Sequence, residues 1–147
     1  MKRHGAITLV GLIVVGSTLW AAPATARGSC TQTGNDRAND ISGTQGADVL
    51  CGRGGDDRLV GLAGDDRLRA ERGNDLLLGG SGADALKGGG QDDTLIGGPG
   101  LDRLSGGLGS DIIDATGGEA DVVRGGGGTD VCFVDREDSV RGCEEIV

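Results

Sequence analysis

The chain has almost no aromatic side chains. Its 147 residues include one Trp, one Phe and no Tyr, and the Trp lies within the first 26 residues. This scarcity excludes a conventional globular core, which buries many bulky apolar groups. Small aliphatic residues alone offset the conformational entropy of a chain poorly, so folding needs a further source of free energy.

The sequence also lacks the motifs of common hydrolases and zinc enzymes. Its one His, His4, lies near the N-terminus, and neither HExxH nor GxSxG occurs. Adjacent acidic pairs such as Asp56-Asp57 do not suggest an acid and a base, because neighbouring side chains of a strand or turn point in different directions. We therefore expect no catalytic residues and no enzyme activity.

Basic residues are outnumbered by acidic ones, with 14 Lys and Arg against 23 Asp and Glu and a formal net charge of −9. An acidic chain of this kind is repelled by nucleic acids and by anionic membranes, and it attracts divalent cations. We therefore expect no nucleic-acid partner.

A long apolar run occurs only near the N-terminus. A positively charged start (residues 2–4) precedes a largely apolar segment (residues 6–20), and a small-residue A-x-A site ends at Ala26. The run is shorter than the roughly 18 to 20 residues of a membrane span, so residues 1–26 are predicted to be a secretory signal peptide. Cleavage removes two basic residues and no acidic one, which changes the net charge from −9 to −11 and leaves no membrane span. The protein is expected to be secreted and extracellular.

Glycine is abundant, with 32 residues, and an aspartate recurs every nine residues. Each unit between Gly43 and Asp114 is a glycine-rich turn, an aspartate and a three-residue strand. A period of nine is much shorter than the repeats of about 20 to 50 residues that form helical or leucine-rich solenoids, so each unit is one turn and one short strand. An all-β parallel solenoid is therefore predicted. The eight aspartates are Asp48, Asp57, Asp66, Asp75, Asp84, Asp93, Asp102 and Asp111.

The middle residue of each strand is expected to form the core, because side chains alternate along an extended chain. These residues are Leu50, Leu59, Leu68, Leu77, Leu86, Leu95, Leu104 and Ile113. A disordered tail rich in Gly and Asp is the alternative, but such a tail has no reason to keep an aliphatic residue two positions after every aspartate.

The units resemble the hemolysin-type calcium-binding repeats (RTX family), whose nonapeptide is GGxGxDxUx with U a large aliphatic residue. The resemblance covers residues 43–114. It implies a β-roll in which two nonapeptides make one turn, so that each loop stacks on the loop two units further on. It also implies calcium between stacked loops, in up to six regular sites. The implied ligands are the eight aspartates and the loop carbonyls near Gly43, Gly52, Gly61, Gly79, Gly88, Gly97 and Gly106.

Calcium binding also agrees with the chemistry of the residues themselves. Calcium takes about 6 to 8 oxygen ligands, and a glycine-rich turn can direct several carbonyls toward one point. Stacked carboxylates repel one another unless a divalent cation lies between them. The leading hypothesis is a secreted, non-catalytic calcium-binding protein that is disordered without calcium and folds on binding it outside the cell.

The repeat pattern becomes irregular at both ends, as in other solenoids that must stop stacking. We predict an N-terminal cap with a degenerate repeat at residues 27–42, calcium-binding repeats at 43–114, and irregular repeats with a C-terminal cap at 115–147. The register stretches by one residue at Asp121 and resumes at Asp130.

Four cysteines lie in pairs near the two ends: Cys30, Cys51, Cys132 and Cys143. An even number in an exported chain predicts disulfides, and their positions favour pairing within each end, although four cysteines allow three connectivities. A zinc site is the less favoured alternative, because no His remains after cleavage and there is no CxxC.

Some loops depart from the glycine pattern. Gln91 replaces the fourth-position glycine and costs about 1 to 2 kcal/mol if that turn is left-handed. The second-position glycine is kept in the later units and replaced in the first four, by Thr44, Arg53, Leu62 and Glu71. We predict tighter calcium sites in residues 79–111, with the Gln91 loop as a local defect.

Outward-facing residues differ between alternate units, which are expected to lie on opposite sheets. One sheet presents mostly aliphatic residues and the other presents Arg and Lys. The aliphatic positions are Val60, Leu76, Leu78, Ile96 and Ile112. They are either a simple consequence of β propensity or a surface that binds a protein partner or a second copy. An extracellular adhesion or interaction module is therefore the alternative function.

Overall fold

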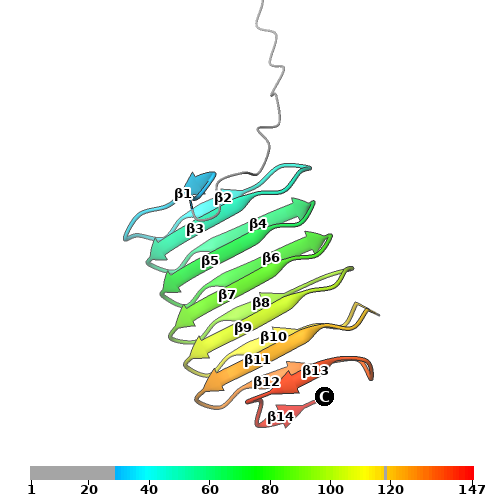
Figure 1. Cartoon of the computed structure of the whole chain (residues 1–147). Coiled ribbons are helices and arrows are strands. Elements are labelled where there is room, and N and C mark those ends of the chain that lie inside the picture. The colour runs from blue at the N-terminus through cyan, green and yellow to red at the C-terminus, as the bar shows by residue number, and fades with distance from the viewer. Residues whose placement is uncertain (1–28, 118) are drawn as a thin grey trace, which may run out of the picture.

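The computed structural model describes residues 29–117 and 119–147, and the predicted signal peptide lies outside them. The described residues form an all-β solenoid in which every named strand pairs in parallel with its neighbours (Figure 1). No part of this region is a helix of the length and apolarity that crossing a membrane requires.

The fourteen strands of the described residues are two to six residues long. They are β1 (Gln32–Thr33), β2 (Asp40–Ser42), β3 (Val49–Gly54), β4 (Arg58–Ala63), β5 (Arg67–Arg72), β6 (Leu76–Ser81), β7 (Ala85–Gly90), β8 (Thr94–Ile96), β9 (Arg103–Leu108), β10 (Ile112–Asp114), β11 (Val122–Gly127), β12 (Val131–Phe133), β13 (Ser139–Arg141) and β14 (Glu145–Ile146).

Odd-numbered strands form one seven-stranded sheet and even-numbered strands form the other. The chain crosses between the sheets at each glycine turn, so a full coil takes two nonapeptides. Leu50 of β3 pairs with Leu68 of β5, and Leu68 pairs with Leu86 of β7, a step of 18 residues each time. The predicted β-roll and its stacking of every second loop are confirmed.

The core is a single file of aliphatic side chains between the two sheets. All eight predicted core residues, from Leu50 to Ile113, are at most 2% exposed. Val123 and Cys132 extend the file beyond the regular repeats, and Ile41 extends it into the N-terminal strands. A core with only one large aliphatic side chain per strand leaves little apolar burial to stabilise the fold.

Gln91, at the fourth loop position, has a left-handed backbone with a φ of 77°. The strain cost predicted for a left-handed turn therefore applies to it. The second loop position is left-handed too, with φ values of 86° at Arg53, 85° at Leu62 and 82° at Glu71. Side chains at positive φ are strained. The first coils of the solenoid therefore contain more backbone strain than the later ones, which have glycine at this position.

Both ends of the solenoid are closed by disulfides with the favoured pairing. Cys30 is bonded to Cys51 on β3, and Cys132 on β12 is bonded to Cys143, with Cα–Cα distances of 5.9 and 6.1 Å. Cys51 points outward but is buried. The strands β1, β2 and β11 to β14 continue both sheets beyond residues 43–114.

Candidate metal centre

The predicted aspartates lie in two ladders, one along each row of turns. Each precedes a strand by one residue and is at most 7% exposed. The backbone N–H of each aspartate donates to Oδ1 of the next aspartate in its ladder, at 2.7 to 2.9 Å. The structure therefore brings together the stacked pairs that the sequence predicted, such as Asp66 with Asp84.

The second carboxylate oxygen, Oδ2, has no hydrogen-bond partner in most of these residues. A buried carboxylate oxygen without a partner is costly unless a proton or a cation compensates it. The unpaired Oδ2 atoms belong to Asp57, Asp66, Asp75, Asp84, Asp93, Asp102, Asp111, Asp121 and Asp130.

Seven of these nine oxygens face the first glycine of their own loop, and the other two, in Asp75 and Asp121, belong to loops that begin with Ala. A Cβ placed on Gly79 would lie 2.5 Å from Oδ2 of Asp84 and 2.6 Å from the carbonyl oxygen of Gly97 in the next stacked loop. Glycines 43, 52, 61 and 88 border the same combination of oxygens. A carboxylate and a carbonyl from successive loops thus converge on a space that only the absence of a side chain leaves open. Oxygen ligands of this kind fit calcium.

Two loops carry a methyl group where the others have this space. Ala70 and Ala115 take the place of the first glycine, and both are fully buried. Oδ2 of Asp75, which follows Ala70, remains without a partner. The rung at Ala70 therefore has the charged oxygen of the other rungs but less room beside it.

The first rung differs because a side chain already satisfies it. Oδ2 of Asp48 accepts hydrogen bonds from the backbone N–H of Thr44 at 2.6 Å and from its hydroxyl at 2.9 Å. Asp48 is therefore the one predicted aspartate whose Oδ2 is not a buried oxygen without a hydrogen-bond partner.

The ladders continue beyond the predicted set through Asp121 and Asp130, and Asp121 in turn donates its N–H to Oδ1 of Asp138. Asp102 donates its N–H to Asp121 and Asp111 donates its N–H to Asp130, each across 19 residues instead of 18. Their Oδ2 atoms are unpaired like those of the regular repeats. The signal in the sequence was the aspartate two residues before Val123 and Cys132, which are buried core residues.

Burial raises the pKa of the ladder aspartates in the absence of a cation. The pKa rises to about 6 for Asp66 and Asp102 and to about 7 for Asp93. Desolvation is the main cause, hydrogen bonds from backbone N–H groups oppose it, and neighbouring carboxylates add to it. The pKa is also raised, for the same main reason, at Asp57, Asp75, Asp84, Asp111 and Asp121.

A second, exposed ladder explains the adjacent acidic pairs. Oδ1 of Asp56 accepts the N–H of Asn74, whose own Oδ1 accepts the N–H of Asp92. Oδ1 of Asp92 in turn accepts the N–H of Ser110. The first member of each acidic pair therefore joins successive turns, and the second member points into the solenoid. This division of roles gives no paired acid and base.

Within residues 29–117 and 119–147, no three His, Cys, Asp or Glu side chains gather as a metal-binding group. The carboxylates approach one another as stacked pairs, so the remaining ligands of any bound ion must be backbone carbonyls. An all-oxygen set of this kind suits a hard cation and not a transition metal.

This protein is a parallel solenoid, and its stacked glycine turns present rows of unpaired carboxylate oxygens beside carbonyl oxygens. These features define the class of ion-binding β-roll repeat proteins. The model of the RTX calcium-binding nonapeptide repeat (4 copies) matches residues 33–68, 52–86, 60–95, 87–119 and 115–139. The chain belongs to this family. No curated protein and no solved structure matches the chain.

Proposed function

We propose that the protein is a secreted, non-catalytic calcium-binding β-roll that folds when it binds calcium outside the cell. The observation that carries this proposal is the row of buried Oδ2 atoms without hydrogen-bond partners, seven of the nine facing a space beside a glycine. A fold that buries so many carboxylates and so few apolar side chains is unstable without compensating positive charge. Family membership supports calcium as the cation.

The chain's own residues prepare these sites for a cation. A backbone N–H fixes Oδ1 of each aspartate, which directs Oδ2 toward the neighbouring glycine. That glycine leaves room next to the carbonyl of the next loop. Calcium, when bound, supplies the positive charge that neutralises the stacked carboxylates.

We assign the ligands to the eight predicted aspartates, with the carbonyls of the first-position glycines, and add Asp121 and Asp130. Up to six regular sites lie within residues 43–114, and the Asp102–Asp121 and Asp111–Asp130 pairs extend the series. The Thr44 hydroxyl at Asp48 and the methyl groups of Ala70 and Ala115 weaken three of the rungs.

Because folding is coupled to calcium binding, the protein folds only after it has left the cell. Extracellular calcium modules bind with dissociation constants of roughly 10⁻⁴ to 10⁻³ M, far above the free calcium concentration inside a cell. The chain therefore stays unfolded until it meets extracellular calcium, and mass action then stabilises the solenoid. The terminal disulfides agree with an oxidising destination.

Circular dichroism of the chain lacking residues 1–26 tests this function. We expect little β-structure in EGTA, and a cooperative gain of β-structure as calcium is added. Magnesium should produce no such gain, because it requires a tighter octahedral shell. Equal compactness and protease resistance in excess EGTA would refute the proposal.

A second candidate function is protein interaction through the aliphatic face of the even-strand sheet. Val60, Leu78 and Ile96 are in register on β4, β6 and β8, beside Leu76 and Ile112 in the neighbouring column. Ile96 is 37% exposed and Ile112 is 47% exposed. Phe133, at the β12 end of this face, is 36% exposed. An exposed apolar surface of this kind is typical of an interface.

Sedimentation in calcium tests the aliphatic face. If a second copy binds there, the double substitution Leu78→Lys and Ile96→Lys abolishes self-association. Leu101→Lys and Leu108→Lys is the matched control, because both residues are exposed but lie off this face. A wild-type chain that sediments as a monomer, or equal loss in both variants, argues against a second copy as the partner.

A further inference from the structure

The outer face of the odd-strand sheet carries rows of cations. Arg69 on β5 pairs in register with Lys87 on β7, and Arg124 on β11 pairs with Arg141 on β13. Ser105 on β9 connects these two pairs in the same column. The parallel column contains Arg67 and Arg103. We call these six exposed residues the basic face: Arg67, Arg69, Lys87, Arg103, Arg124 and Arg141.

Among the described residues, no member of the basic face forms a salt bridge, although Glu71 lies on β5 two residues after Arg69. The remaining outward positions of β7, β9, β11 and β13 are small or uncharged: Ala85, Ser105, Val122 and Ser139. In the part of the chain that the structure describes, the one salt bridge joins Arg58 to Asp40 on the other sheet. Strands are about 4.8 Å apart, so like charges stand close together without compensation. In a chain with a net charge of −9, this segregation of cations is notable.

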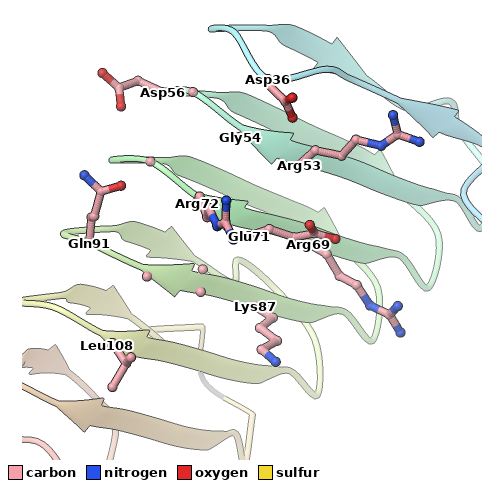
Figure 2. A pocket seen from close by; sticks show the side chains of 15 residues that line it. Asp36, Arg53, Gly54, Asp56, Arg69, Glu71, Arg72, Lys87, Gln91 and Leu108 are labelled. Carbon is pink, nitrogen blue, oxygen red and sulfur yellow. The ribbon is translucent and has the colours of Figure 1, made fainter.

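A shallow hollow of about 1370 Å³ adjoins the basic face. Figure 2 shows Arg53, Arg69 and Lys87 extending on the same side of the strands that line it. Asp36, Asp56 and Glu71 also line the hollow, at the ends of strands or in turns. Glu71 is thus a carboxylate within β5 itself, whereas Asp36 and Asp56 lie outside the odd-numbered strands.

These features select a narrow anionic ligand. Arginine binds carboxylate, sulfate and phosphate groups through its fork of N–H donors. The face has no aromatic side chain on which a nucleobase could stack, and it has too few apolar side chains to enter a membrane. Acidic turns on both edges, at Asp56 and Asp92 on one side and Asp65 on the other, repel a broad anionic surface or a duplex.

We propose that the basic face binds a linear acidic polysaccharide that lies along the solenoid axis across successive strands. Sulfate or carboxylate groups on successive sugars would each meet a basic residue of the next coil. This binding requires the calcium-loaded fold and so rests on the proposed function, but calcium-induced folding is measured separately by circular dichroism.

Heparin is the probe, and calorimetric titration of the chain lacking residues 1–26 in excess calcium is the measurement. The face variant combines Arg69→Gln, Lys87→Gln and Arg124→Gln. The control variant combines Arg37→Gln, Arg58→Gln and Arg136→Gln, which removes the same charge away from the face. The face variant should bind heparin roughly tenfold more weakly, since each exposed charge contact contributes a few-fold. The control should differ from wild type by less than about threefold.

Both variants must show the wild-type calcium-induced gain of β-structure, which separates loss of the ligand site from failure to fold. Parallel titrations use a DNA duplex and phosphatidylcholine vesicles with and without phosphatidylserine. Binding of heparin that weakens only in the face variant supports the proposal. Absence of heparin binding, equal weakening in both variants, or tighter binding to the duplex or the anionic vesicles overturns it.

Discussion

At the scale of single residues, the metal site depends on whether a hydrogen or a methyl group stands beside each carboxylate. Gly79 leaves open the space between Asp84 and the next loop, and Ala70 fills the equivalent space beside Asp75. A ligand set that is otherwise the same thus differs by one carbon atom. The aspartate period gave no indication of this difference, because it reports the charged ligand and not the volume next to it.

We predict that Ala70→Gly adds one bound calcium ion per chain or tightens the weakest site. The opposite change, Gly79→Ala, should remove one ion because its Cβ would meet Oδ2 of Asp84 and a carbonyl oxygen. Gly90→Ala is the control, since the nearest atom to a Cβ there is 3.9 Å away. Calcium is counted by equilibrium dialysis; an unchanged count and affinity in both ladder variants would argue against the assigned space.

Gln91 is the second residue-scale prediction, because its φ of 77° strains a side chain. Gln91→Gly relieves about 1 to 2 kcal/mol of strain, and the greater freedom of glycine in the unfolded chain offsets about 0.5 to 1 kcal/mol of that gain. The calcium concentration at the folding midpoint should therefore fall. Arg72→Gly, at a position without positive φ, should raise the midpoint. The idea fails if both substitutions shift the midpoint in the same direction.

At the scale of strands and turns, the sequence determined the repeat but not its irregular copies. Each unit keeps the same two-residue distance from its aspartate to its core residue, as from Asp57 to Leu59, and this was sufficient to predict the core and a parallel solenoid. The two-unit coil and the stacked pairs were predicted only from the resemblance to the RTX repeats. Asp121 and Asp130 were not predicted as ligands, because one extra residue in a preceding turn interrupts the count. The turn is one residue longer, and the hydrogen bonds of the ladder continue across 19 residues instead of 18.

The terminal disulfides act on the end strands. Each cross-link lowers the conformational entropy of the unfolded chain, and in the chain-entropy description this stabilises the fold by about 3 kcal/mol. We predict that Cys132→Ser with Cys143→Ser raises the calcium concentration at the folding midpoint more than Cys30→Ser with Cys51→Ser. Cys132 is a fully buried core residue, whereas Cys51 lies on the outer side of its strand. Calcium titration by circular dichroism measures both, and equal midpoints in all three proteins would contradict the prediction.

At the scale of the whole molecule, the two carboxylate ladders couple folding, calcium and protons. The calcium-free fold holds protons on buried aspartates whose pKa reaches about 6 at Asp66 and about 7 at Asp93. In the unfolded chain these groups titrate near pH 4. The folded state therefore binds more protons than the unfolded state between about pH 4 and pH 7, so the calcium-free fold loses stability as the pH rises through this window.

Calcium binding has the opposite dependence, because it requires the same carboxylates to be deprotonated. We predict that in EGTA the β-structure is greater near pH 5 than near pH 8, whereas the calcium concentration needed for folding is higher near pH 5. Both quantities come from circular dichroism over a pH series. The matched control is Asp93→Asn, whose neutral side chain should reduce the pH dependence of calcium-free folding and raise the calcium requirement at neutral pH. A calcium-free fold that gains stability with rising pH would mean that the ladder carboxylates are not the groups that keep the solenoid open, and that another interaction controls when it closes.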